Sequence, residues 1–398
     1  MGQGTQPAAP EPDLRSGALS EGWPQGTAPV VSLYVHVPFC DVRCPYCHFS
    51  CFVNRDQDLF DRWAMAIRTQ FGRMREHFGV RELASIYFGG GTPTALPPSA
   101  RSTMVQLLAD EMMPMLAVGG EVTLECNPES AWPESLTPWV DAGVNRLSLG
   151  LQSMDPTVLE FLGRLNTPDS NRRALDLACS LVDEVSIDLI AASPPDGRQT
   201  LLSAIDEVLQ WPVRHVSAYL LEIHAATRFG RDLKAGRLVP RPDDEQAGIY
   251  RAMAASLSGH GLSAYELSNF AVEGSQSRHN RRYWLRQAYL GLGPSAHSNV
   301  GAWRWAELRD TASWCEAVES DRALLEDLEQ LGPNEVRDER ILLGLRLREG
   351  IEADLLEGRE ALVREFSKAG LLVQESGRVA ATLDGWLLLD QIVARLTA

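Results

Sequence analysis

The sequence predicts an α/β protein built on a parallel, barrel-like sheet, with a small α+β module at its C-terminal end. Short apolar runs alternate with longer amphipathic stretches at least six times, which implies a parallel sheet with right-handed crossovers. The runs are rich in Val, Ile and Leu, as expected for strands that are covered on both faces. Polar or glycine-rich residues follow many of these runs, which is typical of α/β proteins that build a site at the carboxyl ends of their strands.

The expected elements follow one another from residue 30 onwards. We expect strands at 31–37, 84–88, 121–125, 146–150, 184–190 and 215–221. We expect helices that include 59–78, 100–109, 156–163, 171–181 and 201–210. Residues 1–28 are rich in Gly, Pro and Ala and carry no periodic apolar pattern, so we predict a disordered tail there.

After residue 300 the pattern changes, and we treat 29–300 and 301–398 as separate units. Residues 321–349 are predicted to be helical. Residues 359–398 predict a helix, two short strands around Gly377 and a helix at 384–396, an arrangement that resembles a winged-helix module. From 316 to 398 there are 10 Lys and Arg residues against 18 Asp and Glu residues, so DNA binding by this module is disfavoured and a packing or docking role is expected.

The charge and hydropathy of the whole chain argue against a nucleic-acid-binding, membrane-spanning or secreted protein. With 37 basic and 53 acidic residues the net charge is −16, the wrong sign for a protein that must neutralise phosphates. No apolar run reaches the ~18 residues of a membrane span, and no basic segment followed by an apolar stretch marks a secretory signal. We therefore expect a cytoplasmic protein with reduced thiols and without an integral membrane segment or a nucleic-acid partner.

Four of the seven cysteines fall within twelve residues, at Cys40, Cys44, Cys47 and Cys51. The first three have the spacing C-x3-C-x2-C, on a loop directly after the first strand. A zinc site usually has a second pair of ligands, which is missing here, although structural zinc with Cys51 or His48 remains an alternative. Three thiolates on one loop suit three irons of a 4Fe-4S cluster, whose fourth iron stays open for a small molecule.

This cysteine loop, with an aromatic residue before its third cysteine, resembles the radical S-adenosylmethionine (SAM) superfamily. The resemblance implies a partial (β/α)6-type barrel, an open iron that chelates the amino and carboxylate groups of SAM, and an electron donor for the cluster. The glycine run 89–91 after the strand SIYF stands where the superfamily binds the SAM amino group, and glycines allow close backbone approach. Glu125 ends a strand where its carboxylate could accept both ribose hydroxyls.

Longer segments narrow the resemblance to oxygen-independent coproporphyrinogen III oxidase and its relatives. These segments are LYVHVPFC, YFGGGTPT, LSLGLQS and SIDLI, and the match runs from about residue 31 to the C-terminus. The resemblance implies that cluster-bound SAM contacts Tyr34, Tyr46, Gly90 and Glu125. It implies that a second SAM site is lined by Gly91, Thr92, Gln152, Arg164 and Asp188. Each of these polar residues, taken alone, is also compatible with an ordinary strand end, and His36 receives no role.

Two features separate the chain from the oxidase. Phe49 replaces the extra cysteine of the oxidase pattern, and the resulting C-x3-C-x2-C-x-F form is typical of the HemW group of heme chaperones, which resemble the oxidase but lack its activity. The sequence HNRRYW at 279–284 matches the H-N-x-x-Y-W motif of that group. This resemblance implies heme as a ligand, with His279 as a ligand of its iron. The alternative is a loop histidine whose nitrogens are satisfied by hydrogen bonds.

The leading hypothesis is a heme chaperone that holds a SAM-ligated 4Fe-4S cluster and transfers heme to an acceptor protein. The competing hypothesis is a radical SAM enzyme, either a coproporphyrinogen III oxidase or a related methyltransferase, although Phe49 argues against the oxidase. A third possibility is a structural protein that is held together by zinc.

Overall fold

The computed structural model describes residues 23–53, 56–195, 197–322 and 325–398. Within these residues, twelve strands form one sheet in the order β12-β11-β10-β9-β1-β2-β3-β4-β5-β6-β8-β7. The central six strands are β1 (Val30–Val37), β2 (Glu82–Gly90), β3 (Leu116–Cys126), β4 (Arg146–Gln152), β5 (Glu184–Ala191) and β6 (His215–Leu220). They pair in chain order, each parallel to the next. The predicted α/β fold with a parallel sheet is confirmed, and the sheet stays open.

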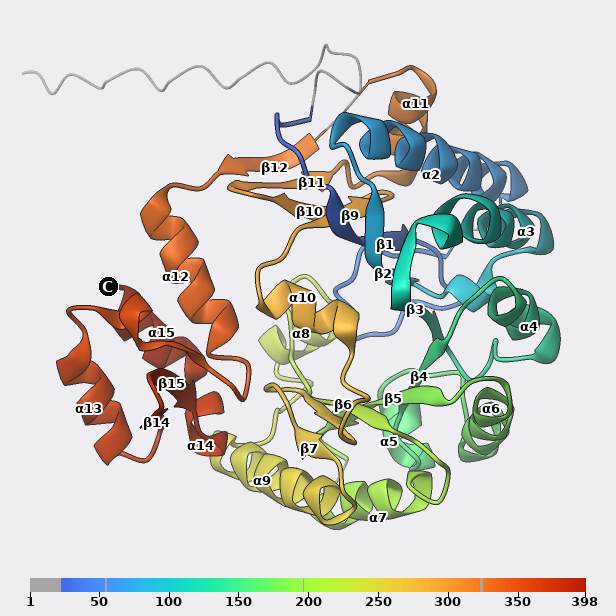
Figure 1. Cartoon of the computed structure of the whole chain (residues 1–398). Helices are drawn as coiled ribbons and strands as arrows, with labels where there is room; N and C mark the ends of the chain where they lie inside the picture. Colours follow the sequence, from blue (N-terminus) through green and yellow to red (C-terminus); the bar gives the residue numbers. More distant parts are fainter. Residues whose placement is uncertain (1–22, 54–55, 196, 323–324) are drawn as a thin grey trace, which may run out of the picture.

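Helices connect the parallel strands and lie along the outer side of the curved sheet (Figure 1). They are α2 (Gln57–His77), α3 (Pro98–Leu107), α4 (Pro133–Asp141), α5 (Pro156–Phe161), α6 (Pro168–Leu181) and α7 (Arg198–Val208). Their start signals are visible in the sequence, since Asp155 and Thr167 accept hydrogen bonds from the first-turn N–H groups of α5 and α6, and each is followed by proline at the first helical position. The strand interiors pack with these helices into one large apolar core.

The sheet extends beyond the predicted strands at both edges. Beyond β6 the chain forms α8 (Arg228–Lys234), α9 (Asp243–Gly259), β7 (Ser263–Ala264) and β8 (Asn269–Ala271). It then crosses through α10 (Arg278–Trp284) to the other edge. There it forms β9 (Tyr289–Leu292), β10 (His297–Val300), β11 (Trp303–Glu307), α11 (Thr311–Glu319) and β12 (Leu325–Gln330). Strand β9 pairs parallel to β1, while β8 pairs antiparallel to β6. These short strands place α10 against the inner face of β2.

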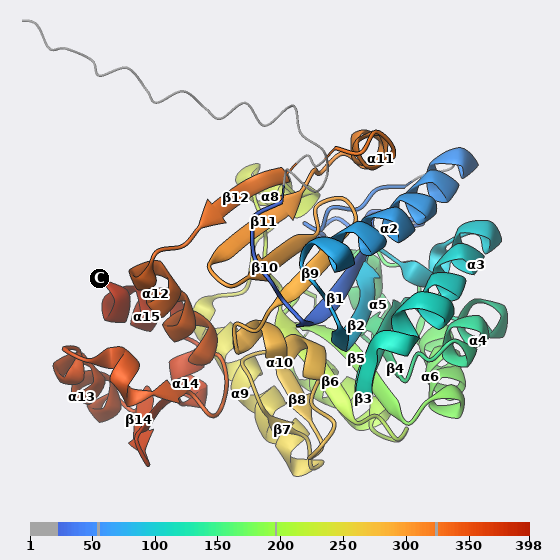
Figure 2. The same cartoon turned by 45° about the horizontal axis from the view of Figure 1, so that its top comes forward.

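The C-terminal unit has a core of its own, separate from the sheet core. It contains α12 (Pro333–Gly344), β13 (Ile351–Glu352), α13 (Glu360–Lys368), β14 (Leu372–Glu375), β15 (Arg378–Ala381), α14 (Leu383–Trp386) and α15 (Leu389–Thr397). The strands around Gly377 are present, joined by β13 into a three-stranded sheet. The helix expected at 384–396 is divided into α14 and α15. Figure 2 shows this unit beside α10 and the open edge of the barrel.

The structure differs from the expected helix at 321–349 and from part of the expected N-terminal tail. Part of 321–349 is not helical, because residues 325–330 pair antiparallel with β11 as the edge strand β12. The tail expected at 1–28 lies outside the described residues up to 22. Trp23 and Ala28, however, are buried, and the Trp23 indole N–H donates to Glu307 Oε1 at 3.4 Å. No helix in the described part of the chain is long and apolar enough to cross a membrane.

Candidate functional site

A cavity of about 600 Å³ lies at the carboxyl ends of the parallel strands, where the sequence predicts one shared pocket. Its walls include these residues predicted for the site: Cys40, Cys44, Tyr46, Cys47, Gly90, Gly91, Thr92, Glu125, Gln152, Arg164 and Asp188. Residues at the carboxyl ends of five strands, or on the loops that follow them, therefore contribute to it. Tyr34 is half-buried, with its hydroxyl beside Gly90, and the C-terminal unit closes the far side of the cavity with Arg346, Trp386 and Leu387.

The cysteine loop is held at its base by backbone pairing. The Cys40 N–H donates to the Phe52 carbonyl at 3.1 Å, and the Phe52 N–H donates to the Pro38 carbonyl at 2.9 Å. A third contact comes from His36, for which no role was predicted. Its Nε2 lies 2.9 Å from the Ser50 carbonyl oxygen, and its Nδ1 lies 3.1 Å from the Tyr34 hydroxyl. The carbonyl can only accept, so Nε2 carries the proton and Nδ1 accepts from Tyr34. His36 thereby fixes both the loop and the tyrosine.

The three predicted ligand thiols face the cavity, and polar donors reach two of them. The Thr92 hydroxyl donates to Cys40 Sγ at 3.6 Å, and Arg164 Nη1 donates to Cys44 Sγ at 3.8 Å. Donors aimed at sulfur stabilise thiolates, the form that binds iron, so the residues fit a 4Fe-4S cluster. No three His, Cys, Asp or Glu side chains of the described residues lie close enough together to hold a single metal ion.

Cys51 joins the thiol group as a buried fourth member. Its Sγ lies 3.9 Å from Cys47 Sγ. Hydrogen bonding from the Cys51 thiol lowers the pKa of Cys47 to about 7 and also lowers the pKa of Cys40, while Cys51 itself has its pKa raised well above the ordinary value. Burial raises the pKa of Cys44. The shared proton of the Cys47–Cys51 pair is therefore favoured on Cys51, whose pKa is raised, over Cys47, whose pKa is lowered.

The glycine run after β2 allows this turn to approach the cysteine loop. The Gly91 N–H donates to the Val37 carbonyl at 2.7 Å, and the Thr92 N–H donates to the Phe39 carbonyl at 2.8 Å. A Cβ on Gly91 would collide with the Phe39 carbonyl oxygen, and a Cβ on Gly90, which has a φ of 105°, would overlap the His36 ring. The glycines are therefore required by backbone packing as well as by any ligand.

Glu125 points from the end of β3 towards this turn. Its Oε1 accepts from the Tyr87 hydroxyl at 2.7 Å, and its Oε2 accepts from the Gly90 N–H at 3.0 Å. Burial raises the pKa of this carboxyl from 4.5 to about 7. Since the folded pKa lies above the unfolded one, the free energy of unfolding falls as the pH rises between these values. Near neutral pH, Glu125 is therefore present both as the protonated acid and as the carboxylate that accepts hydrogen bonds.

This pKa predicts a pH dependence for SAM binding. If the carboxylate accepts the ribose hydroxyls, the affinity for SAM is expected to increase as the pH rises through 7, because protonation removes the acceptor. Isothermal titration at pH 6, 7 and 8, with Glu125→Gln as the control, measures this. The variant is expected to bind more weakly and with a smaller slope. Parallel slopes in the two proteins would assign the pH dependence to SAM itself.

Arg164 organises the opposite wall of the cavity. Besides Cys44, it donates from Nη2 to Asn127 Oδ1 at 2.8 Å and to the Gly150 carbonyl at 3.0 Å, and from Nε to Asn166 Oδ1 at 2.9 Å. Asn127 in turn donates to the Thr92 hydroxyl at 2.8 Å. Asn127 was not predicted for the site. Its position directly after the strand that carries Glu125 could have indicated it, because polar residues at strand ends face the cavity. The network links the cysteine loop to the ends of three strands.

Three further predicted residues line the cavity: Asp188, Gln152 and Tyr46. Asp188 is 3.4 Å from the Ser148 hydroxyl, and burial raises its pKa to about 6. Gln152 ends β4 with a φ of 66°, a left-handed conformation that is uncommon outside glycine and is often found at functional sites. The Tyr46 ring packs near Phe229, with ring centroids 6.5 Å apart, which carries the loop against the segment that follows β6.

His279 is not among the residues that line the cavity, and unlike Tyr34 it does not lie directly behind them. It is buried inside the barrel, where Nδ1 lies 2.9 Å from the Ser85 hydroxyl and Nε2 lies 2.7 Å from the Tyr283 hydroxyl. Glu121 accepts the backbone N–H groups of Arg278 and His279 at 2.9 and 3.0 Å. Both imidazole nitrogens are therefore engaged, which matches the alternative of a satisfied histidine.

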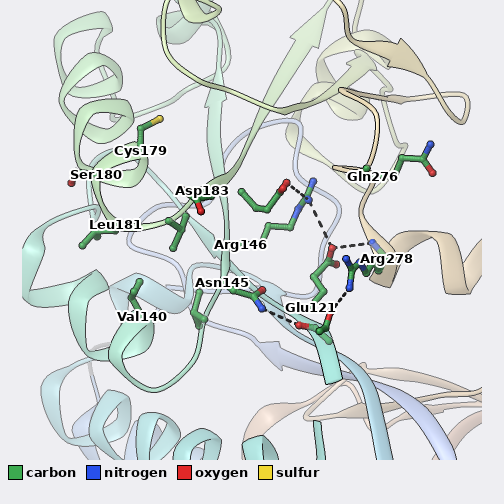
Figure 3. Close-up of a pocket in the computed structure, with 16 residues that line it drawn as sticks. Glu121, Val140, Asn145, Arg146, Cys179, Ser180, Leu181, Asp183, Gln276 and Arg278 are labelled. Carbon is green, nitrogen blue, oxygen red and sulfur yellow. Dashed lines mark hydrogen bonds and ion pairs between the residues drawn. The ribbon is translucent and has the colours of Figure 1, made fainter. Parts of the chain in front are cut away.

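A second cavity of about 510 Å³ lies at the opposite edge of the sheet (Figure 3). Its charged side chains pair with one another: Arg146 lies 3.4 Å from Glu184 and 3.8 Å from Glu121. None of the residues predicted for the site is among its lining residues. Ion pairs thus join β3, β4 and β5 here, and hydrogen bonds from Arg278 to Glu121 and Gly119 attach α10 to β3.

Comparison with known proteins agrees with this geometry. The family model described as "Radical SAM superfamily" matches residues 34–208. The chain is 34% identical over 374 residues to the heme chaperone HemW of Mycobacterium tuberculosis (strain ATCC 25618 / H37Rv), covering 92% of this chain and 94% of that protein. It is 34% identical over 421 residues to the radical S-adenosyl methionine domain-containing protein 1, mitochondrial, of Bos taurus, covering 98% and 93%. Among solved structures, coproporphyrinogen III oxidase (HemN) from Escherichia coli has the same fold, with a TM-score of 0.80 and 21% identity over 94% of this chain and 91% of that one.

Proposed function

The chain belongs to the radical SAM superfamily, among the relatives of the heme chaperone HemW, and from this premise we propose that it is itself a heme chaperone. It binds heme together with a SAM-ligated 4Fe-4S cluster and passes the heme to an acceptor protein. The observation that carries this proposal is the single cavity in which the cysteine loop, the polar strand ends and an apolar wall meet. All seven cysteines are free in the structure, which supports a reducing, cytoplasmic setting.

Membership of the superfamily implies a 4Fe-4S cluster and SAM. We assign the cluster to Cys40, Cys44 and Cys47, on the donors that Thr92 and Arg164 aim at the sulfurs. A cluster held there and reduced by an electron donor would supply one-electron chemistry towards bound SAM. The chain's own contributions are positional, since Glu125 and the Gly90 backbone bind SAM and His36 holds Tyr34 against them.

A second SAM is proposed at the predicted residues that line the cavity along neighbouring strand ends. These residues are Gly91, Thr92, Gln152, Arg164 and Asp188. The strained backbone of Gln152 and the raised pKa of the buried Asp188 support a ligand at this wall, because strain and perturbed titration concentrate at functional sites.

Hemin titration of the purified full-length protein tests the proposal. A saturable change in the Soret absorbance is expected. A change that grows linearly with hemin, without saturation, would count against heme binding and hence against a chaperone.

The intact set of SAM residues favours one competing function, a radical SAM enzyme that acts on a porphyrinogen. An anaerobic assay with a reductant, SAM and coproporphyrinogen III separates the two functions. We expect no protoporphyrinogen, because Phe49 stands where the oxidase pattern has a further cysteine. Formation of protoporphyrinogen would replace the chaperone proposal with the oxidase.

A further inference from the structure

The cavity has two chemically different halves. The inner half, at the strand ends, is lined by the thiols and by polar groups such as Thr92, Glu125 and Asp188. The outer half lies between the barrel and the C-terminal unit. Its walls are largely aromatic and aliphatic and are made by Tyr219, Tyr250, Leu267, Trp386 and Leu387. An occupant of the outer half therefore needs a broad apolar surface.

Two arginines line this cavity, and they differ in what their N–H groups already bind. Arg164, in the inner half, has all three of its nitrogens engaged by Cys44, Asn127, Gly150 and Asn166. Arg346, in the outer half, makes one side-chain hydrogen bond, a long one of 3.5 Å from Nη2 to Glu266 Oε2. Its buried Nε has no hydrogen-bond partner among the described residues. Nε is too deeply buried to meet a ligand, but Nη1 is not fully buried and also has no hydrogen-bond partner among the described residues, so it is the donor that a ligand can reach.

The position of Arg346 is fixed by its neighbours. Its guanidinium stacks over the Trp284 ring, with Cζ 4.3 Å from the ring centroid. Trp284 is the last residue of the HNRRYW segment, so the far end of α10 supports an arginine of the cavity although His279 at the near end is buried. The backbone is tied as well, because the Leu267 N–H donates to the Arg346 carbonyl at 3.1 Å and the Trp386 indole donates to the Leu345 carbonyl at 3.0 Å.

Arg346 is not the only donor to the Glu266 carboxylate. It is fully buried and also accepts from the Ser268 N–H at 2.8 Å and from the Asn269 amide. Three donors thus share this carboxylate, and the stacked guanidinium keeps further N–H groups for another acceptor. A fork of N–H donors suits a carboxylate.

We propose that Arg346, stacked on Trp284, is an anion subsite of the outer cavity that binds a carboxylate of a flat apolar ligand. This inference rests on the proposed function, under which the ligand is heme and the carboxylate is one of its propionates. The apolar walls take the macrocycle, and the arginine selects the acidic edge. The subsite assigns a role to the tryptophan of the H-N-x-x-Y-W segment that is independent of iron ligation.

Comparing hemin with hemin dimethyl ester, whose propionates are uncharged, tests the subsite. Both are titrated into the full-length protein and into Arg346→Met. The matched control is Arg348→Met, because Arg348 is an exposed arginine two residues further along the same segment. Unmodified protein is expected to prefer hemin by about ten-fold, the size of a charge-assisted hydrogen bond. Arg346→Met is expected to lose this preference, whereas Arg348→Met keeps it and Arg346→Lys keeps part of it.

Three outcomes would overturn the subsite. They are equal binding of the acid and the ester by the unmodified protein, an undiminished preference in Arg346→Met, or an equal loss of SAM affinity in that variant, which would mean that the arginine serves the SAM carboxylate. Circular dichroism and the thermal midpoint of each variant show whether it is folded. Failure of the unmodified protein to bind hemin or the ester would instead remove the proposed function, and the subsite with it.

Discussion

Replacing Gly91 by alanine is expected to prevent the cysteine loop from reaching the geometry that binds a cluster. The new Cβ would meet the carbonyl oxygens of Val37 and Phe39, which are backbone atoms and cannot rotate away. The turn would have to withdraw, breaking its two hydrogen bonds to the loop, at a cost of about 2 kcal/mol before any strain is counted. Iron and sulfide content after anaerobic reconstitution is expected to fall to a small fraction of that of the unmodified protein.

Gly72→Ala is the matched control for this experiment. Gly72 lies within α2, and a Cβ there would have nothing within 4 Å, so alanine should leave the cluster content unchanged and stabilise the helix by about 1 kcal/mol. Full cluster loading in Gly91→Ala would contradict the close approach of the two segments.

His279→Ala is expected to destabilise the protein by about 3 kcal/mol. The substitution removes a ring from the barrel interior and leaves the hydroxyls of Ser85 and Tyr283 without this partner. Burial lowers the pKa of His279 to about 3, so the ring is neutral at pH 7 and the loss is not one of charge. Urea unfolding followed by circular dichroism measures the change.

His260→Ala supplies the comparison, because that histidine is partly exposed at the end of α9 and should contribute less than about 0.5 kcal/mol. The same samples should be titrated with hemin. A His279→Ala protein with an unchanged unfolding midpoint and no Soret change would contradict the structural role and favour an iron ligand at this position.

The sequence predicts what depends on local period and on position along a strand. The six parallel strands and the polar residues after them follow from apolar runs and turn residues, and the structure brings eleven of the thirteen residues predicted for the site to the walls of one cavity. Contacts between distant segments leave no such pattern. The hydrogen bond between His36 and Ser50 and the stacking of Arg346 on Trp284 depend on how loops and units pack, which spacing alone does not encode.

Tertiary contacts decide two features that the local pattern does not encode. Leu325 and Leu328 are three residues apart, the spacing of a helix, yet they lie in β12, because pairing with β11 outweighs local preference. The ring of His279 points into the barrel because α10 packs across β2, and its role as a heme ligand stays a prediction.

Electron paramagnetic resonance of the reconstituted, reduced protein, with and without SAM, tests the three-thiol site most directly. On our proposal Cys40, Cys44 and Cys47 supply three ligands, which would leave one iron for SAM. We therefore expect a spin-1/2 cluster signal whose g values change when SAM is added and which disappears in Cys44→Ser. A sample without iron and without an EPR signal, or a cluster signal whose g values do not change on addition of SAM, would contradict an open iron at this loop.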